Sequence, residues 1–150
     1  MTKRFKLFPY LSALLLFLTF SVACKKDCSS KLTFYEVGMT GDYKNWRDTS
    51  FIVATKDENL IKEINAQLKL PVEERRMVIG KLEAGSAGYN RNATHEFKWH
   101  FKENDWHLTD MTVEIYDGRP HSDVDADTTY WLNTMTRFAP WSSYIKRKLK

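Results

Sequence analysis

The chain has 150 residues, with 23 lysine and arginine residues, 19 acidic residues and a formal net charge of +4. This length suits one domain that buries a core without disulfide bonds. Three of the basic residues lie in the first 23 positions, so the other 127 residues carry 20 basic and 19 acidic side chains. That near balance argues against a nucleic-acid partner, which would require a basic stripe to contact several phosphates.

The first 23 residues form the pattern of a secretory signal peptide. A short basic start with Lys3, Arg4 and Lys6 precedes the apolar run 11–20, and small residues follow up to Ala23. The apolar run is too short for a membrane span, which requires about 20 apolar residues.

Cys24 follows this segment directly. The tetrapeptide Ser21-Val22-Ala23-Cys24 resembles the lipobox of bacterial lipoproteins, although Ser21 stands where leucine is usual and Val22 is bulkier than the common residue. The resemblance implies that the Cys24 thiol carries a diacylglycerol, which anchors the protein in a membrane. An ordinary cleaved signal peptide is the alternative. We expect a bacterial cell-envelope location, with the outer membrane favoured by the charged residues 25–27.

Cys28 is the second cysteine of the chain. A disulfide between Cys24 and Cys28 would close a very small loop and stabilise little, and a zinc site would require a second pair of ligands. We therefore predict a signal peptide over residues 1–23, a flexible tether over 24–31 and one globular domain over 32–150.

The first half of the domain predicts two strands, a helix and a further strand. The β-rich segments 32–37 and 50–55 flank a polar stretch, which predicts a hairpin with a long loop. Asp57 is a suitable N-cap for a helix that ends before Pro71. Residues 75–85 are apolar on both faces at their middle, which predicts a central strand.

The second half predicts two strands, a helix and a final strand. In residues 95–101 and 109–117 apolar and polar side chains alternate, which predicts strands with one buried face. Ser122 is expected to cap a helix, and residues 139–149 to form a short strand or an extended arm. The sum predicts an α+β domain with an antiparallel or mixed sheet and about two helices packed on one face.

Histidine and acidic residues suggest metal ligands at first sight. His95 and His100 lie five positions apart on one predicted strand, so they face opposite sides. Residues 123–134 begin like an EF-hand, but Thr128 and Thr134 replace the required Gly and Glu. We therefore predict no metal site and no cofactor, and we interpret Asp123 and Asp125 as acidic residues of a first helical turn.

Catalytic patterns do not assemble in this sequence. Asp110 and Glu114 share a predicted strand face, but their backbones would lie about 13 Å apart, too far for a glycosidase pair. Ser142 and Ser143 do not lie in a nucleophile elbow. We therefore predict a non-enzymatic protein. A periplasmic enzyme or an enzyme inhibitor is the alternative.

Five stretches of the chain together resemble a known family. They are FIVATKDENLIKEI, VIGKLEAGSAGYN, EFKWHF, MTVEIYDG and APWSSYI. In order and spacing over residues 33–149 they are similar to the amino-terminal domain of an amoebal calmodulin-binding protein. The resemblance implies a fold and no catalytic residues. Calmodulin itself is not an expected partner, because the name describes a whole eukaryotic protein.

The resemblance also implies a contact. Where family members tend to have two cysteines, this chain has Tyr116 and Ala139. Their joint absence predicts that Tyr116 and Ala139 are neighbours in the folded domain.

These observations lead to one functional expectation. We predict a lipid-anchored binding or scaffolding domain of the cell envelope, with the membrane as one partner and an unknown protein or small ligand as the other. The candidate binding surface consists of Tyr89, Asn90, Trp141, Ser142 and Ser143. The alternative for these five residues is a structural role, in which they complete the core edge and shape a loop.

Overall fold

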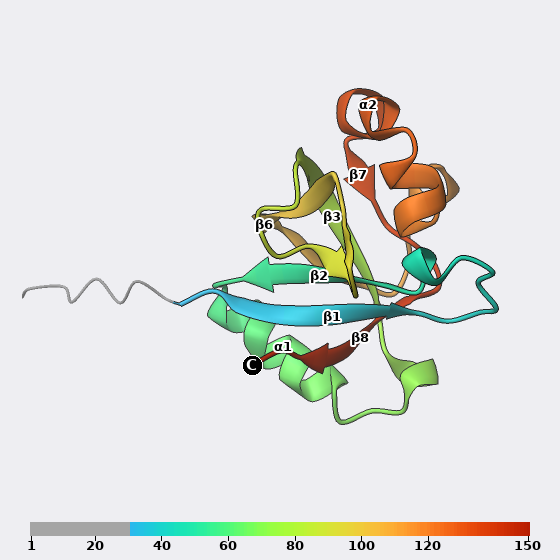
Figure 1. Cartoon of the computed structure of the whole chain (residues 1–150). Helices are drawn as coiled ribbons and strands as arrows, with labels where there is room; N and C mark the ends of the chain where they lie inside the picture. Colours follow the sequence, from blue (N-terminus) through green and yellow to red (C-terminus); the bar gives the residue numbers. More distant parts are fainter. Residues whose placement is uncertain (1–30) are drawn as a thin grey trace, which may run out of the picture.

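The computed structural model describes residues 31–150. The predicted signal peptide, Cys24 and Cys28 lie outside the described residues. The described part is a single α+β domain, which confirms the predicted fold class (Figure 1). Within residues 31–150, no helix is both long and apolar enough to cross a membrane.

The first sheet has three strands in the order β2-β1-β8. They are β1 (Thr33–Met39), β2 (Ser50–Thr55) and β8 (Ser143–Lys148), and both pairings are antiparallel. The predicted hairpin and the predicted final strand are therefore confirmed. The loop between β1 and β2 contains the short 3-10 helix η1 (Trp46–Asp48).

Helix α1 (Glu58–Gln67) follows β2, as predicted. The Asp57 side chain accepts hydrogen bonds from the backbone N–H groups of Asn59 and Leu60, at 2.8 and 3.4 Å. The 3-10 turn η2 (Val72–Glu74) connects α1 to the second sheet.

The second sheet has the order β6-β3-β7, with β3 (Met77–Ala84) between β6 (Trp99–Thr109) and β7 (Arg137–Phe138). The predicted central strand is confirmed. A small hairpin of β4 (Arg91–Asn92) and β5 (His95–Glu96) lies between β3 and β6 in the chain. The predicted strand 95–101 is thus divided between β5 and β6, although Phe97, Trp99 and Phe101 are buried as expected.

The predicted strand over residues 109–117 is wrong. Strand β6 continues through Thr109 and already supplies the buried side chains Trp106 and Leu108. The chain then leaves the sheet. Residues 110–113 are irregular and the 3-10 turn η3 (Glu114–Tyr116) follows. The three apolar side chains expected to face the core are exposed instead, namely Met111, Val113 and Ile115.

The predicted helix after Ser122 exists in a different form. It consists of three short pieces, the π-helix η4 (Pro120–Asp125), the α-helical turn α2 (Thr128–Tyr130) and the π-helix η5 (Trp131–Met135). Ser122 is not the cap, because η4 begins two residues earlier. π-helical turns occur often at functional sites, so η4 and η5 are of interest beyond the fold.

An aromatic cluster joins the two sheets. The Phe51 ring of β2 lies 5.3 Å from Trp99, 5.6 Å from Phe101 and 5.8 Å from Phe138, measured between ring centroids. All four side chains are fully buried. Trp131 of η5 packs edge-on against Phe138 at 5.6 Å. Aromatic pairs at such distances stabilise a core beyond the burial of their surface, so this cluster fixes the helical segments on the sheets.

Gly80 provides the close approach of β3 to this cluster. A Cβ atom at Gly80 would lie 2.5 Å from the Phe101 ring, and the buried neighbours of Phe101 prevent the ring from moving. We expect Gly80→Ala to lower the free energy of unfolding by about 1–3 kcal/mol through overpacking, measured by urea denaturation. Lys81→Ala, at the exposed next position, is the control and should change it by less than about 0.5 kcal/mol. Equal stability of the two variants would contradict this packing.

Candidate functional site

Two of the predicted surface residues, Tyr89 and Asn90, have structural contacts. Asn90 is fully buried, and its side chain accepts a hydrogen bond from Ile52 N at 2.9 Å and donates one to the Trp99 carbonyl at 2.8 Å. Tyr89 is half-buried and packs edge-on against Phe34. Burial, together with the charges of Glu103 and Glu83, raises the pKa of Tyr89 above its ordinary range. Asn90 therefore joins strands and does not face a partner.

The other three predicted residues lie in the turn before β8. Ser143 is buried, and its hydroxyl donates to the Pro140 carbonyl at 2.6 Å and accepts from Val78 N at 3.1 Å. Trp141 is 50% exposed. The Ser142 hydroxyl lies 2.6 Å from the Tyr43 hydroxyl.

Trp141 and Ser142 line a polar surface depression of about 460 Å³. Its other lining residues are Tyr43, Asp117, Gly118, Arg119 and Asp123. Tyr89 lines a different depression, together with Phe34 and Arg91. The five predicted residues therefore divide between separate places, and Trp141 and Ser142 are the pair that a ligand can reach in one depression.

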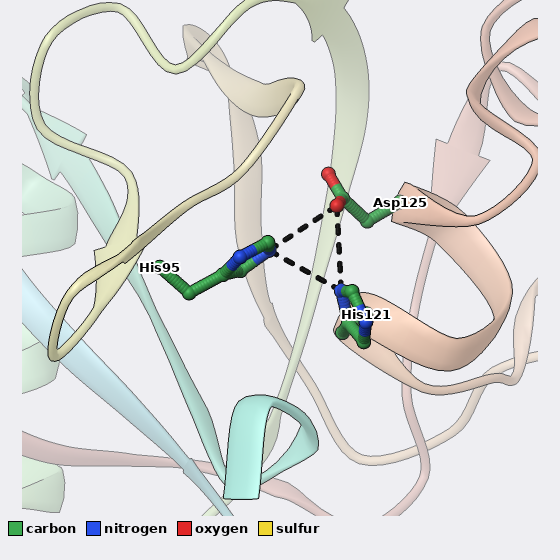
Figure 2. Close-up of side chains that lie close together, drawn as sticks. All are labelled: His95, His121 and Asp125. Carbon is green, nitrogen blue, oxygen red and sulfur yellow. Dashed lines mark hydrogen bonds and ion pairs between the residues drawn. The ribbon is translucent and has the colours of Figure 1, made fainter. Parts of the chain in front are cut away.

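A second cluster was not expected from the sequence. His95 of β5 meets His121 and Asp125 of η4, and the three side chains point toward one another (Figure 2). The distance from Asp125 Oδ2 is 3.2 Å to His95 Nε2 and 3.4 Å to His121 Nδ1, and the two ring nitrogens lie 3.2 Å apart. We call these three residues the triad.

The surrounding structure fixes the triad in place. Asp125 is 1% exposed, and its second carboxylate oxygen accepts a hydrogen bond from Lys98 N at 2.6 Å. The His95 ring packs edge-on against Phe97, at 5.0 Å between centroids. The carboxylate of Asp125 therefore has one oxygen committed to the backbone and the other directed at both histidines.

Asp48 positions the helical half of the triad. Its side chain is buried and accepts hydrogen bonds from His121 N and Ser122 N, both at 2.8 Å, and from the Ser122 hydroxyl at 2.5 Å. A carboxylate that binds the free N–H groups of a helical first turn stabilises it. The bond from η1 thus holds η4 where His121 and Asp125 reach His95.

The prediction of no metal site considered His95 with His100, and these two histidines do lie apart. His100 Nδ1 instead lies 2.7 Å from the Gly85 carbonyl oxygen, on the other side of the strand. The missed signal is the spacing of His121 and Asp125, which are four residues apart on one helical face. The interpretation of Asp125 as an acidic residue of a first helical turn overlooks its burial. Two imidazoles and a carboxylate are a donor set that can hold a divalent metal ion.

Comparison with models of protein families gives a match, over residues 37–150, to the N-terminal domain of a calmodulin-binding protein. The chain belongs to this family of N-terminal domains. The predicted resemblance to the amino-terminal domain of an amoebal calmodulin-binding protein is thereby confirmed. Comparison with curated proteins and with solved structures gives no match.

Within this member of the family, Tyr116 and Ala139 are neighbours, as predicted. Ala139 N donates a hydrogen bond to the Tyr116 carbonyl at 2.9 Å. Backbone pairing therefore maintains this contact where cysteines are absent.

Asp48 offers a test of how the triad is held. We expect Asp48→Ala to lower the free energy of unfolding by about 2 kcal/mol or more, because hydrogen bonds to a buried charged group are lost, and to speed amide hydrogen exchange at His121 and Ser122. Urea denaturation and native-state exchange measure the two effects. The matched control is Asp57→Ala, which removes the cap of α1 and should leave exchange at His121 unchanged. Unchanged exchange at His121 in Asp48→Ala would contradict the role of Asp48.

Proposed function

We propose that this protein is a lipid-anchored, non-enzymatic binding protein of a bacterial cell envelope. The single observation that carries the proposal is the stretch Ser21-Val22-Ala23-Cys24 after an apolar signal-like segment. An acylated cysteine buries several fatty chains, each contributing about 0.8 kcal/mol per CH₂, and thus anchors a domain durably. We favour the outer membrane as its location.

The arrangement of the first sheet supports a membrane location. Strand β8 runs antiparallel to β1, with Tyr35 opposite Lys148, and Leu149 N donates to the Phe34 carbonyl at 2.9 Å. The C-terminal strand therefore ends beside the start of β1, as Figure 1 also shows. The chain from Cys24 to Lys31 can reach roughly 25 Å at most. This end of the domain would lie near the bilayer.

The same end of the domain is rich in exposed lysines. Lys31, Lys148 and Lys150 are all exposed there. A lysine near an anionic membrane surface contributes about 1 kcal/mol of attraction. The lysines would complement the lipid anchor and leave the opposite end of the domain free.

The depression lined by Trp141 and Ser142 supports a binding role. A half-exposed tryptophan beside carboxylates, a guanidinium and hydroxyl groups offers an apolar ring together with directional polar contacts. We propose that this depression contacts the unknown protein or small ligand.

Cys24 and Cys28 provide a matched pair for testing the anchor. In a bacterial host labelled with radioactive palmitate, we expect the unaltered protein and Cys28→Ala to carry the label and to enter the detergent phase of a detergent partition. Cys24→Ala should be unlabelled and remain in the aqueous phase, because it lacks the thiol that takes the lipid. Label retained by Cys24→Ala, or an unaltered protein in the aqueous phase, would refute the anchor.

Trp141 and Trp46 provide a matched pair for testing the binding depression, since they are 50% and 45% exposed. Envelope extract is passed over the immobilised full chain, and the retained molecules are identified by mass spectrometry. We expect Trp141→Ala to lose at least one molecule that the unaltered protein and Trp46→Ala both retain, with little change in stability. A retained set that is the same for all three proteins would remove Trp141 from the binding surface.

A further inference from the structure

We propose that His95, His121 and Asp125 form a binding site for one divalent transition-metal ion of the zinc class. The three side chains would supply three ligands and leave one coordination position open to water or to another ligand. This proposal is independent of the lipid anchor, because it rests only on the geometry of the described domain.

The spacing of the three donor atoms has the size that zinc requires. Zinc binds imidazole nitrogen and carboxylate oxygen at about 2.0–2.1 Å, which places neighbouring ligand atoms of a tetrahedron about 3.3–3.4 Å apart. In the triad the three separations are 3.2, 3.2 and 3.4 Å. The donor atoms therefore already outline one face of a zinc tetrahedron.

Hydrogen bonds alone do not satisfy this triangle of atoms. If one of the two facing ring nitrogens carries a proton, the other directs a lone pair at the lone pairs of an ionised Asp125. If both carry protons, both can donate to Asp125, but the two N–H groups then face each other. In either case one of the three short contacts contains no hydrogen bond. A cation among the three atoms would make all three contacts favourable.

The triad is built like a metal site beyond its three ligand atoms. Ligating carboxylates are commonly held by a further hydrogen bond from the protein, and Lys98 N supplies one to Asp125 at 2.6 Å. Asp48 fixes the backbone at His121. The Lys98 ammonium lies 3.4 Å from the Asp125 backbone carbonyl oxygen and is bonded there, not to the ligand oxygen. Little rearrangement is therefore required when the ion binds.

The ligand set indicates which metals would bind. Imidazole nitrogen suits zinc and its transition-metal neighbours, whereas calcium and magnesium prefer six or more oxygen ligands. Three protein ligands with an open fourth position are typical of sites that exchange a ligand, and four protein ligands are typical of purely structural zinc. The structure thus favours a zinc-class ion whose open position is available to an exogenous ligand.

Zinc chloride titrated into the metal-stripped, full-length protein in detergent solution tests this proposal by calorimetry. We expect one zinc ion per chain, no displacement by excess calcium chloride, and a rise in the midpoint of thermal unfolding on zinc addition. The variants His95→Gln, His121→Gln and Asp125→Asn should each bind zinc about 100-fold more weakly or worse.

The control is His107→Gln, which changes an exposed histidine on β6 and should bind zinc like the unaltered protein. If a triad variant does not fold by circular dichroism, the two remaining triad variants decide the result. Cobalt chloride gives a second readout, since four-coordinate cobalt has a strong visible absorption that the triad variants should lack. The proposal is overturned if zinc does not bind at micromolar protein concentration, or if the triad variants bind as tightly as His107→Gln.

Discussion

The buried carboxylate of Asp48 is the interaction on which the arrangement of this domain depends. It lies in η1, between the two strands of the first hairpin, and it binds two backbone N–H groups and one hydroxyl of η4. A buried carboxylate without such partners would be costly, so the loop after β1 and the first turn of η4 are stable only together. Through this joint, a segment distant in the sequence is held where its His121 and Asp125 meet His95.

The aromatic cluster provides the rigid support around that joint. Phe51, Trp99 and Phe138 come from three strands in two sheets, and Trp131 adds the second π-helix to them. The Trp99 indole N–H donates to the Pro120 carbonyl at 3.1 Å, which ties the cluster to the start of η4. Core packing and the polar joint therefore fix the same helical segment from two sides. A preorganised triad is the consequence, since both of its halves are built on elements that the core holds.

Much of the fold could be predicted from local patterns. The Asp57 cap, the two-sided apolar middle of β3 and the alternation through Phe97 and Phe101 each depend on nearby residues only. The alternation of Met111, Val113 and Ile115 misled for a physical reason, because Trp106 and Leu108 had already filled the core positions that a strand there would have used. Local periodicity cannot reveal that a neighbouring strand is longer than expected.

The triad could not be predicted in the same way, since His95 and Asp125 meet only after η4 folds onto the loop that contains Asp48. Its most direct test is X-ray diffraction from crystals of the zinc-treated protein at wavelengths on both sides of the zinc absorption edge. The account predicts one anomalous peak at about 2.0–2.2 Å from His95 Nε2, His121 Nδ1 and Asp125 Oδ2. Zinc bound elsewhere, with the three side chains still in contact and no peak between them, would contradict it.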